Sequence, residues 1–238
     1  MKYILSIVFV LFAFATFGFT KPRVLIFSKT AVFHHESIAV GVPAIIKLGQ
    51  QNNFDVDTTT NSALFTLGNL KKYKAVIFLS TTGDVLNPEQ QTAFEQYIKQ
   101  GGGYLGVHSA TDTEYDWPWY GNLVGAYFKN HPEKQQEANL KIVDRNFIAT
   151  KGLPATWRRL DEWYNFKWIA KRLHVVIKID EKSYTGGENG SNHPMAWYHN
   201  YDGGRAFYTA LGHTDASYSE PLFLKHLLGG IKYAIGQK

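Results

Sequence analysis

Three runs of consecutive apolar residues limit what this chain can fold into. They lie within residues 23–28, 75–80 and 104–108, and runs of this kind are typical of strands buried on both faces of a sheet. A fourth candidate strand covers residues 54–58, and a helical pattern covers residues 37–51. Alternating strands and helices at this spacing predict right-handed βαβ units, and therefore a parallel sheet with helices on both faces.

A second helix is marked by its ends. Asn87 is a typical N-cap, Pro88 occupies the first helical position, and Gln90 lies three residues after the cap. The glycines at 101–103 end the helix, and the strand at 104–108 follows.

The C-terminal half is less regular. Residues 174–180 suit a strand, and residues 195–198 and 205–210 flank a turn at 202–204, which predicts an antiparallel hairpin. A final helix is expected from Pro221 to about residue 235. We predict one domain over residues 21–238 of the α/β class, an open, mostly parallel, flavodoxin-like sheet with helices on both faces and antiparallel additions in its C-terminal half.

The first twenty residues have the pattern of a secretory signal peptide. Lys2 precedes an apolar run over residues 3–19, which ends at the polar residues 20–22. We therefore expect a signal peptide at 1–20, cleavage near residues 15–20, and a periplasmic or secreted protein. The alternative is an uncleaved N-terminal anchor, which is the single route by which we expect membrane association.

Composition excludes several kinds of chemistry. The sequence contains no cysteine, which rules out disulfides, thiolate nucleophiles, Cys-ligated zinc and iron–sulfur clusters. The formal charge is +5, but the basic residues occur singly or in pairs and form no stripe. We expect no nucleic-acid partner and no nucleotide cofactor.

Histidines follow two of the predicted parallel strands. In open parallel sheets, ligands bind beyond the carboxyl ends of the strands, a rule that selects His34, His35 and His108. The segment Gly106–Ala110 also has the Gly-x-nucleophile-x-small pattern of an elbow, in which a sharp turn presents one side chain at the edge of the sheet. His108 occupies the apex of that pattern. The alternative is that His108 caps the helix that follows.

The C-terminal half adds Glu162 and His213 as candidates. Their spacing to His35 and His108 is too irregular for a local metal motif. Three imidazoles and one carboxylate converging from distant loops would nevertheless suit a divalent metal such as zinc or manganese. We therefore take His35, His108 and His213 as candidate metal ligands, and His108, Glu162 and His35 as candidate catalytic residues. The alternative for Glu162 is a solvated loop carboxylate.

Aromatic residues are abundant, with 6 Trp, 14 Tyr and 16 Phe. Flat rings beside polar side chains suit the faces of sugars, although core packing explains any single ring equally well. Arg205 could bind a carboxylate, a phosphate or a hydroxyl, or could be a plain strand-edge cation. The candidate substrate-binding residues are His34, Asp112, Tyr164, Trp197 and Arg205.

Together, six blocks of sequence resemble the ThuA-like family, which is named for trehalose utilisation and has a fold similar to class I glutamine amidotransferases. The resemblance extends from Arg23 to about Ile235, and it is carried by residues 24–37, 102–112, 161–164, 194–197, 204–208 and 211–214. It implies a role in sugar catabolism, including the handling of oxidised (3-keto) glycosides. Amidotransferases carry Cys at the elbow, whereas this chain has His108, so glutamine hydrolysis by a thiolate is excluded.

Three functions remain open from the sequence. The first is an exported enzyme that acts on a disaccharide or keto-sugar, through a bound metal or through direct acid–base work by histidines. The second is a non-catalytic sugar-binding module that uses Trp117, Trp119 and Trp197. The third is a partner-binding domain, which would need a large exposed apolar patch.

Overall fold

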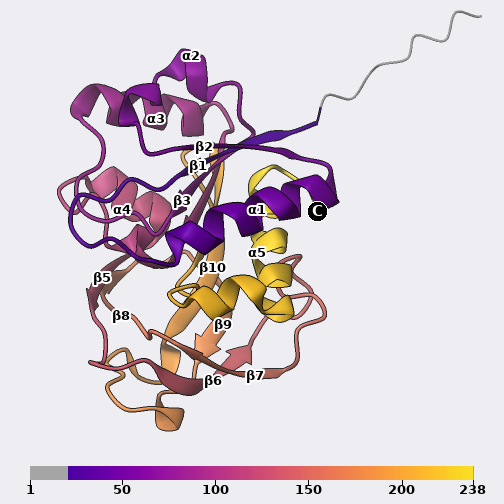
Figure 1. Cartoon of the computed structure of the whole chain (residues 1–238). Coiled ribbons are helices and arrows are strands. Elements are labelled where there is room, and N and C mark those ends of the chain that lie inside the picture. Colours follow the sequence, from indigo (N-terminus) through magenta and orange to yellow (C-terminus); the bar gives the residue numbers. More distant parts are fainter. Residues whose placement is uncertain (1–20, 238) are drawn as a thin grey trace, which may run out of the picture.

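A nine-stranded sheet runs through the computed structural model, which describes residues 21–237 (Figure 1). The strand order is β2-β1-β3-β4-β11-β10-β9-β6-β7, and β5 pairs separately with β8. The strands are β1 (Arg23–Phe27), β2 (Asp55–Thr59), β3 (Ala75–Leu79), β4 (Gly103–Val107), β5 (Ala126–Asn130), β6 (Gln136–Ile142), β7 (Thr156–Asp161), β8 (Asn165–Ile169), β9 (His174–Ile179), β10 (Pro194–Tyr201) and β11 (Gly204–Thr209).

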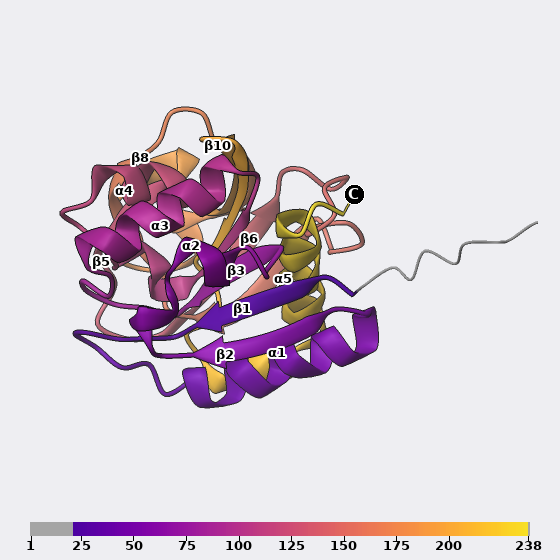
Figure 2. The same ribbon diagram turned by 90° about the horizontal axis from the view of Figure 1, so that it is seen from above.

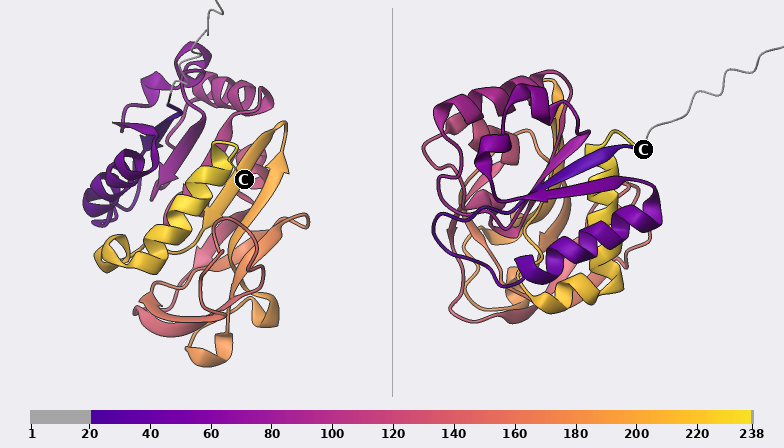
Figure 3. Two further views of the ribbon diagram at one scale, coloured as in Figure 1. Left: turned by 90° about the vertical axis from the view of Figure 1, so that its right-hand side faces the viewer. Right: turned by 45° about the horizontal axis from the view of Figure 1, so that its top comes forward.

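The sheet has a parallel half and an antiparallel half. Strands β2, β1, β3, β4 and β11 are parallel neighbours, and every pairing from β11 to β7 is antiparallel. Strands β3 and β4 are buried at every position, as their unbroken apolar runs predict. Figure 3 shows the antiparallel strands extending the sheet away from the N-terminal strands. The predicted α/β class with antiparallel additions is confirmed.

Helices cover both faces of the parallel half. Helices α1 (Ile38–Asn52) and α5 (Pro221–Ala234) lie on one face, and α2 (Leu67–Leu70) and α3 (Pro88–Lys99) lie on the other (Figure 2). Gly230 lets α5 approach the sheet closely, because a Cβ atom there would lie 2.5 Å from the Phe207 ring. The described residues, 21–237, also contain five short 3₁₀ helices: η1 (Ser62–Leu64), η2 (His108–Thr111), η3 (Glu181–Ser183), η4 (Gly190–Asn192) and η5 (Asp215–Ser219).

The predicted N-cap of α3 is confirmed. The Asn87 side chain accepts a hydrogen bond from the Gln90 backbone at 3.0 Å, and the Gln90 side chain accepts one from the Asn87 backbone at 3.0 Å. This capping box satisfies two backbone N–H groups that would otherwise lack a partner.

The elements between residues 118 and 169 have no counterpart in the sequence predictions. They are α4 (Pro118–Val124), β5, β6, β7 and β8. These strands mix buried and exposed positions, so they lack the continuous apolar runs that mark β1, β3 and β4. The predicted signal peptide at 1–20 lies outside the described residues. Within residues 21–237, no helix has both the length and the apolar character that a membrane span needs.

Candidate metal centre

The end of β4 forms the elbow that the Gly106–Ala110 pattern predicts. His108 has a φ of 53°, in the left-handed region that β-carbon-bearing residues rarely adopt, and η2 begins at the same residue. Gly106 is required two residues earlier, because a Cβ atom there would lie 2.7 Å from the Tyr104 hydroxyl. The turn therefore fixes the direction of the buried His108 imidazole through the backbone.

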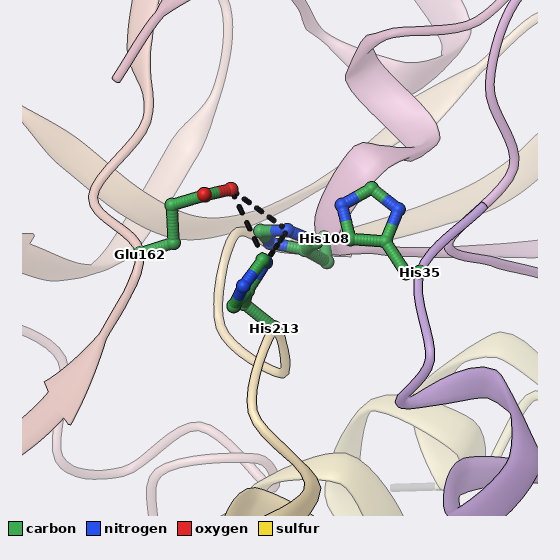
Figure 4. Close-up of side chains that lie close together, drawn as sticks. All are labelled: His35, His108, Glu162 and His213. Atoms are coloured by element: carbon green, nitrogen blue, oxygen red, sulfur yellow. Dashed lines mark hydrogen bonds and ion pairs between the residues drawn. The ribbon is translucent and has the colours of Figure 1, made fainter. Parts of the chain in front are cut away.

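Four predicted residues converge beside this elbow (Figure 4). His35 comes from the loop between β1 and α1, Glu162 follows β7, and His213 follows β11. One potential ligand atom from each of the four, His108 included, lies within 4.8 Å of all the others. Chain segments more than a hundred residues apart thus meet at one point, as the strand-end rule predicted for His35 and His108.

Three of these ligand atoms form a tight triangle. His108 Nε2 lies 3.1 Å from His213 Nδ1 and 3.3 Å from Glu162 Oε2, and His213 Nδ1 lies 3.2 Å from the same oxygen. Two ligands on a tetrahedral zinc at ordinary bond lengths lie roughly 3.3 Å apart. The triangle therefore has the size of one face of a tetrahedral metal site.

The hydrogen bonds around the triangle also suit a metal. His108 Nδ1 lies 2.9 Å from the Ala210 carbonyl and donates to it. This bond places the proton on Nδ1 and leaves the Nε2 lone pair directed at His213 and Glu162. A backbone carbonyl that holds a histidine in this way is a regular partner of metal-ligating imidazoles.

The protonation preferences of two members agree with a ligand role. Burial, followed by the neighbouring His108 and His213, lowers the pKa of His35 to about 2, so its imidazole is neutral. Burial acts to raise the pKa of Glu162, but the adjoining His108 and His213 rings outweigh it and hold that pKa well below its usual value. A neutral imidazole and an ionised carboxylate are the forms that bind metals.

Buried Asp161 holds two of the four residues in place, a role that the sequence predictions missed. Its Oδ1 accepts hydrogen bonds from the backbone N–H of Glu162 at 3.0 Å and of His213 at 3.1 Å. Its Oδ2 accepts one from Gly212 at 3.0 Å and forms an ion pair with Arg159 at 3.0 Å. One carboxylate thus ties the loop after β7 to the loop after β11.

His131 is a further neighbour that the sequence predictions missed. Its Nε2 lies 3.4 Å from Glu162 Oε1, the carboxylate oxygen that faces away from the triangle. The Tyr164 ring lies near both histidine rings, with its centroid 4.4 Å from that of His108 and 6.2 Å from that of His131. His131 follows β5, a strand without a sequence signal, so no rule directed attention to it.

Of the predicted substrate-binding residues, Tyr164, His34 and Asp112 lie near the cluster. Tyr164 packs on His108, and His34 lines a cleft together with His35 and His213. Asp112 lies one residue beyond η2 and accepts a hydrogen bond from the Tyr115 hydroxyl at 2.6 Å.

Trp197 and Arg205 lie away from the cluster, so the structure does not bring them together with the other predicted substrate-binding residues. Trp197 is fully buried in the core, and its indole N–H donates to the Val124 carbonyl at 2.8 Å. Arg205 pairs with Gly103 at the start of β4. Because β11 runs parallel to β4, Arg205 lies beside the amino-terminal end of β4, whereas His108 follows its carboxyl-terminal end. Its guanidinium donates to the Gly101 and Ala234 carbonyls.

The other tryptophans considered for sugar binding also lie elsewhere. Trp117 is buried and stacks on Trp119, with ring centroids 5.1 Å apart. Trp119 donates to Asp202 at 2.8 Å, in the turn that precedes β11. Packing within the fold therefore accounts for these two rings.

Comparison with known proteins identifies the family. The family model ThuA, described as trehalose utilisation, matches residues 23–234. The chain belongs to the ThuA family. A protein from Bacteroides uniformis described as ThuA-like is 22% identical, with a TM-score of 0.76 over 90% of this chain and 91% of that one. A second, from Parabacteroides merdae, is 22% identical, with a TM-score of 0.72 over 91% of each chain.

The fold also occurs within larger proteins. A β-galactosidase from Bacillus circulans is 15% identical, with a TM-score of 0.58, and the match covers 92% of this chain but 32% of that one. At these identities the structural matches establish the fold alone. The search of curated proteins found no match. Family membership connects the chain with sugar catabolism.

Proposed function

We propose that this ThuA-family chain is an exported enzyme of sugar catabolism that acts on a disaccharide or an oxidised (3-keto) sugar with the help of a divalent metal. His108, Glu162 and His213 would hold the ion, with His35 beside them, and zinc or manganese suits these donors. The observation that carries the proposal is the triangle of ligand atoms, with edges of 3.1 to 3.3 Å. Export rests on the N-terminal apolar segment alone.

The residues around the cluster have separable tasks in this proposal. A bound divalent cation would supply Lewis acidity toward a keto or hydroxyl oxygen of the sugar. The Ala210 carbonyl and Asp161 orient the ligands, and His131 contacts the outer oxygen of Glu162. His35 keeps a neutral imidazole at the mouth of the cluster. Direct acid–base catalysis by the same histidines is the competing mechanism.

A plain sugar-binding module is the weaker alternative. Sugar recognition does not require three imidazoles and a carboxylate around one point. The aromatic residues on which that hypothesis depended, Trp117, Trp119 and Trp197, lie outside the cluster. The histidine cluster therefore favours catalysis.

Elemental analysis of protein purified without chelator tests the metal. We expect about one equivalent of a divalent metal in the wild type, and its loss in His108→Ala and Glu162→Gln, because each variant removes one corner of the triangle. His34→Ala is the matched control, since His34 is the exposed neighbour of His35 and is not part of the cluster. Circular dichroism verifies that each variant is folded.

The proposal of a bound metal would be overturned if the folded wild type contained no metal and took up none from added zinc or manganese. Direct acid–base catalysis would then remain. Metal that remains in both folded cluster variants would show that the ion lies elsewhere. A metal-loaded protein is then assayed with keto-glycosides and disaccharides. Absence of turnover with all of them would favour the binding module.

A further inference from the structure

A cleft opens directly onto the histidine cluster. Its volume is about 540 Å³, and His35 and His213 form part of its wall. The other lining residues are Phe33, His34, Glu36, Ser37, Gln135, Thr214 and Asp215. Volumes of this order suit a small-molecule ligand. Any ligand that reaches the cluster by this route must pass between the 33–37 loop and the 213–215 loop.

An exposed aromatic ring is held at this cleft. The side chain of Phe33 is 59% exposed, and its ring packs edge-on against His35 with centroids 4.8 Å apart. The loop that carries it is tied to the segment after β3: the Ala31 N–H donates to the Thr82 carbonyl at 2.8 Å, and the Thr82 hydroxyl donates to the Phe33 carbonyl at 2.7 Å. Phe33 is thus an apolar ring that is fixed in position yet left open to solvent.

Two carboxylates stand at the rim of the cleft. Glu36, in the 33–37 loop, and Asp215, in the 213–215 loop, are exposed carboxylates that line it. None of the nine lining residues, all within the described part of the chain, is a lysine or an arginine. Carboxylates accept hydrogen bonds from hydroxyl groups and repel phosphates and carboxylates. At the rim, these two carboxylates therefore favour an uncharged, hydroxyl-rich ligand over an anion.

We propose that this cleft is the subsite that positions the sugar and selects uncharged sugars over phosphorylated or acidic ones. Phe33 packs against the apolar face of a sugar ring, and Glu36 and Asp215 accept hydrogen bonds from its hydroxyls. The proposal rests on the proposed function, because it assigns the substrate of the same site. It adds a specificity that family membership does not supply.

Ligand-observed NMR titration of the metal-loaded protein tests the subsite with two probes, trehalose and trehalose 6-phosphate. They share their two rings and differ by one phosphate group. We expect trehalose to bind more tightly than its phosphate ester. Phe33→Ala should weaken trehalose binding about 3- to 10-fold, the range typical of a ring-stacking contact.

Two further variants complete the test. Val32→Ala is the matched control for Phe33→Ala, because Val32 is 78% exposed on the same loop but does not line the cleft, so it should bind trehalose like the wild type. The double variant Glu36→Gln/Asp215→Asn should tighten binding of the phosphate ester about threefold or more, and added salt should reduce this gain.

Unchanged trehalose binding in Phe33→Ala, or a wild type that prefers the phosphate ester, would overturn the subsite, as would an absence of trehalose binding. Metal content, measured on the same samples, separates this failure from that of the metal centre. Full metal occupancy with a failed subsite leaves the metal centre standing. Loss of metal in Phe33→Ala would show that the ring acts on His35, not on the sugar.

Discussion

A buried histidine away from the cluster should make the fold sensitive to acid. His226 lies in α5 with a fully buried side chain. Its Nδ1 donates to the Ala149 carbonyl at 2.8 Å, and its Nε2 accepts from the Thr209 hydroxyl at 3.1 Å. Burial lowers the pKa of His226 to about 4; the bond to Ala149 opposes this shift and the Arg159 charge adds to it. The native state thus holds the neutral ring.

The size and sign of the effect follow from this pKa. In the unfolded chain the pKa of a histidine is about 6.5, and each pKa unit corresponds to about 1.36 kcal/mol. At pH values well above about 6.5, His226 is neutral in both the folded and the unfolded state, so its titration costs no stability. As the pH falls below about 6.5, His226 binds a proton in the unfolded chain but stays neutral in the native state. The loss reaches about 2 kcal/mol near pH 5 and levels off at about 3.4 kcal/mol below pH 4.

Urea unfolding of the wild type and His226→Gln near pH 7.5 and near pH 5 measures this loss. Glutamine keeps an uncharged donor and acceptor but does not titrate, so the two proteins should differ in their pH dependence by about 2 kcal/mol. Other histidines titrate equally in both and cancel. Parallel pH dependences would refute the reasoning. NMR of the His226 ring is a direct second measurement, since protonation at about pH 6.5 would contradict the low pKa.

Two more substitutions test the scaffold. Asp161→Asn removes the charge that faces Arg159, so the free energy of unfolding in urea should fall by about 3–5 kcal/mol. In a metal titration, the same variant should bind metal about 10- to 100-fold more weakly. Wild-type values in both assays would contradict the bridging role of Asp161. Asn87→Ala removes the capping box of α3 and should cost about 1 kcal/mol, with unchanged metal content. A larger loss of stability would mean that Asn87 does more than cap the helix.

The parallel half and its strand ends were predictable because a single signal describes them. Unbroken apolar runs mark β1, β3 and β4, and the strand-end rule then selects His35 and His108. Trp197 could not be distinguished as a core residue, since a ring that packs in a core and a ring that binds sugar look alike in a sequence. Arg205 lies away from the cluster because β11 pairs in parallel with β4, which places Arg205 beside the start of β4, whereas His108 follows the end of β4.

Glu162 joins the site through the curvature of the sheet. Strands β10, β9 and β6 separate β11 from β7, so a flat sheet would hold β11 and β7 roughly 19 Å apart. Yet Asp161, the last residue of β7, bonds the backbone of Gly212 and His213 at 3.0 and 3.1 Å. The antiparallel half must therefore curl back over the strand ends. Four reversals from β11 make β7 run in the same direction, so Glu162 arrives from a carboxyl end as the histidines do. The antiparallel strands thereby complete a cluster that the parallel half alone leaves one carboxylate short.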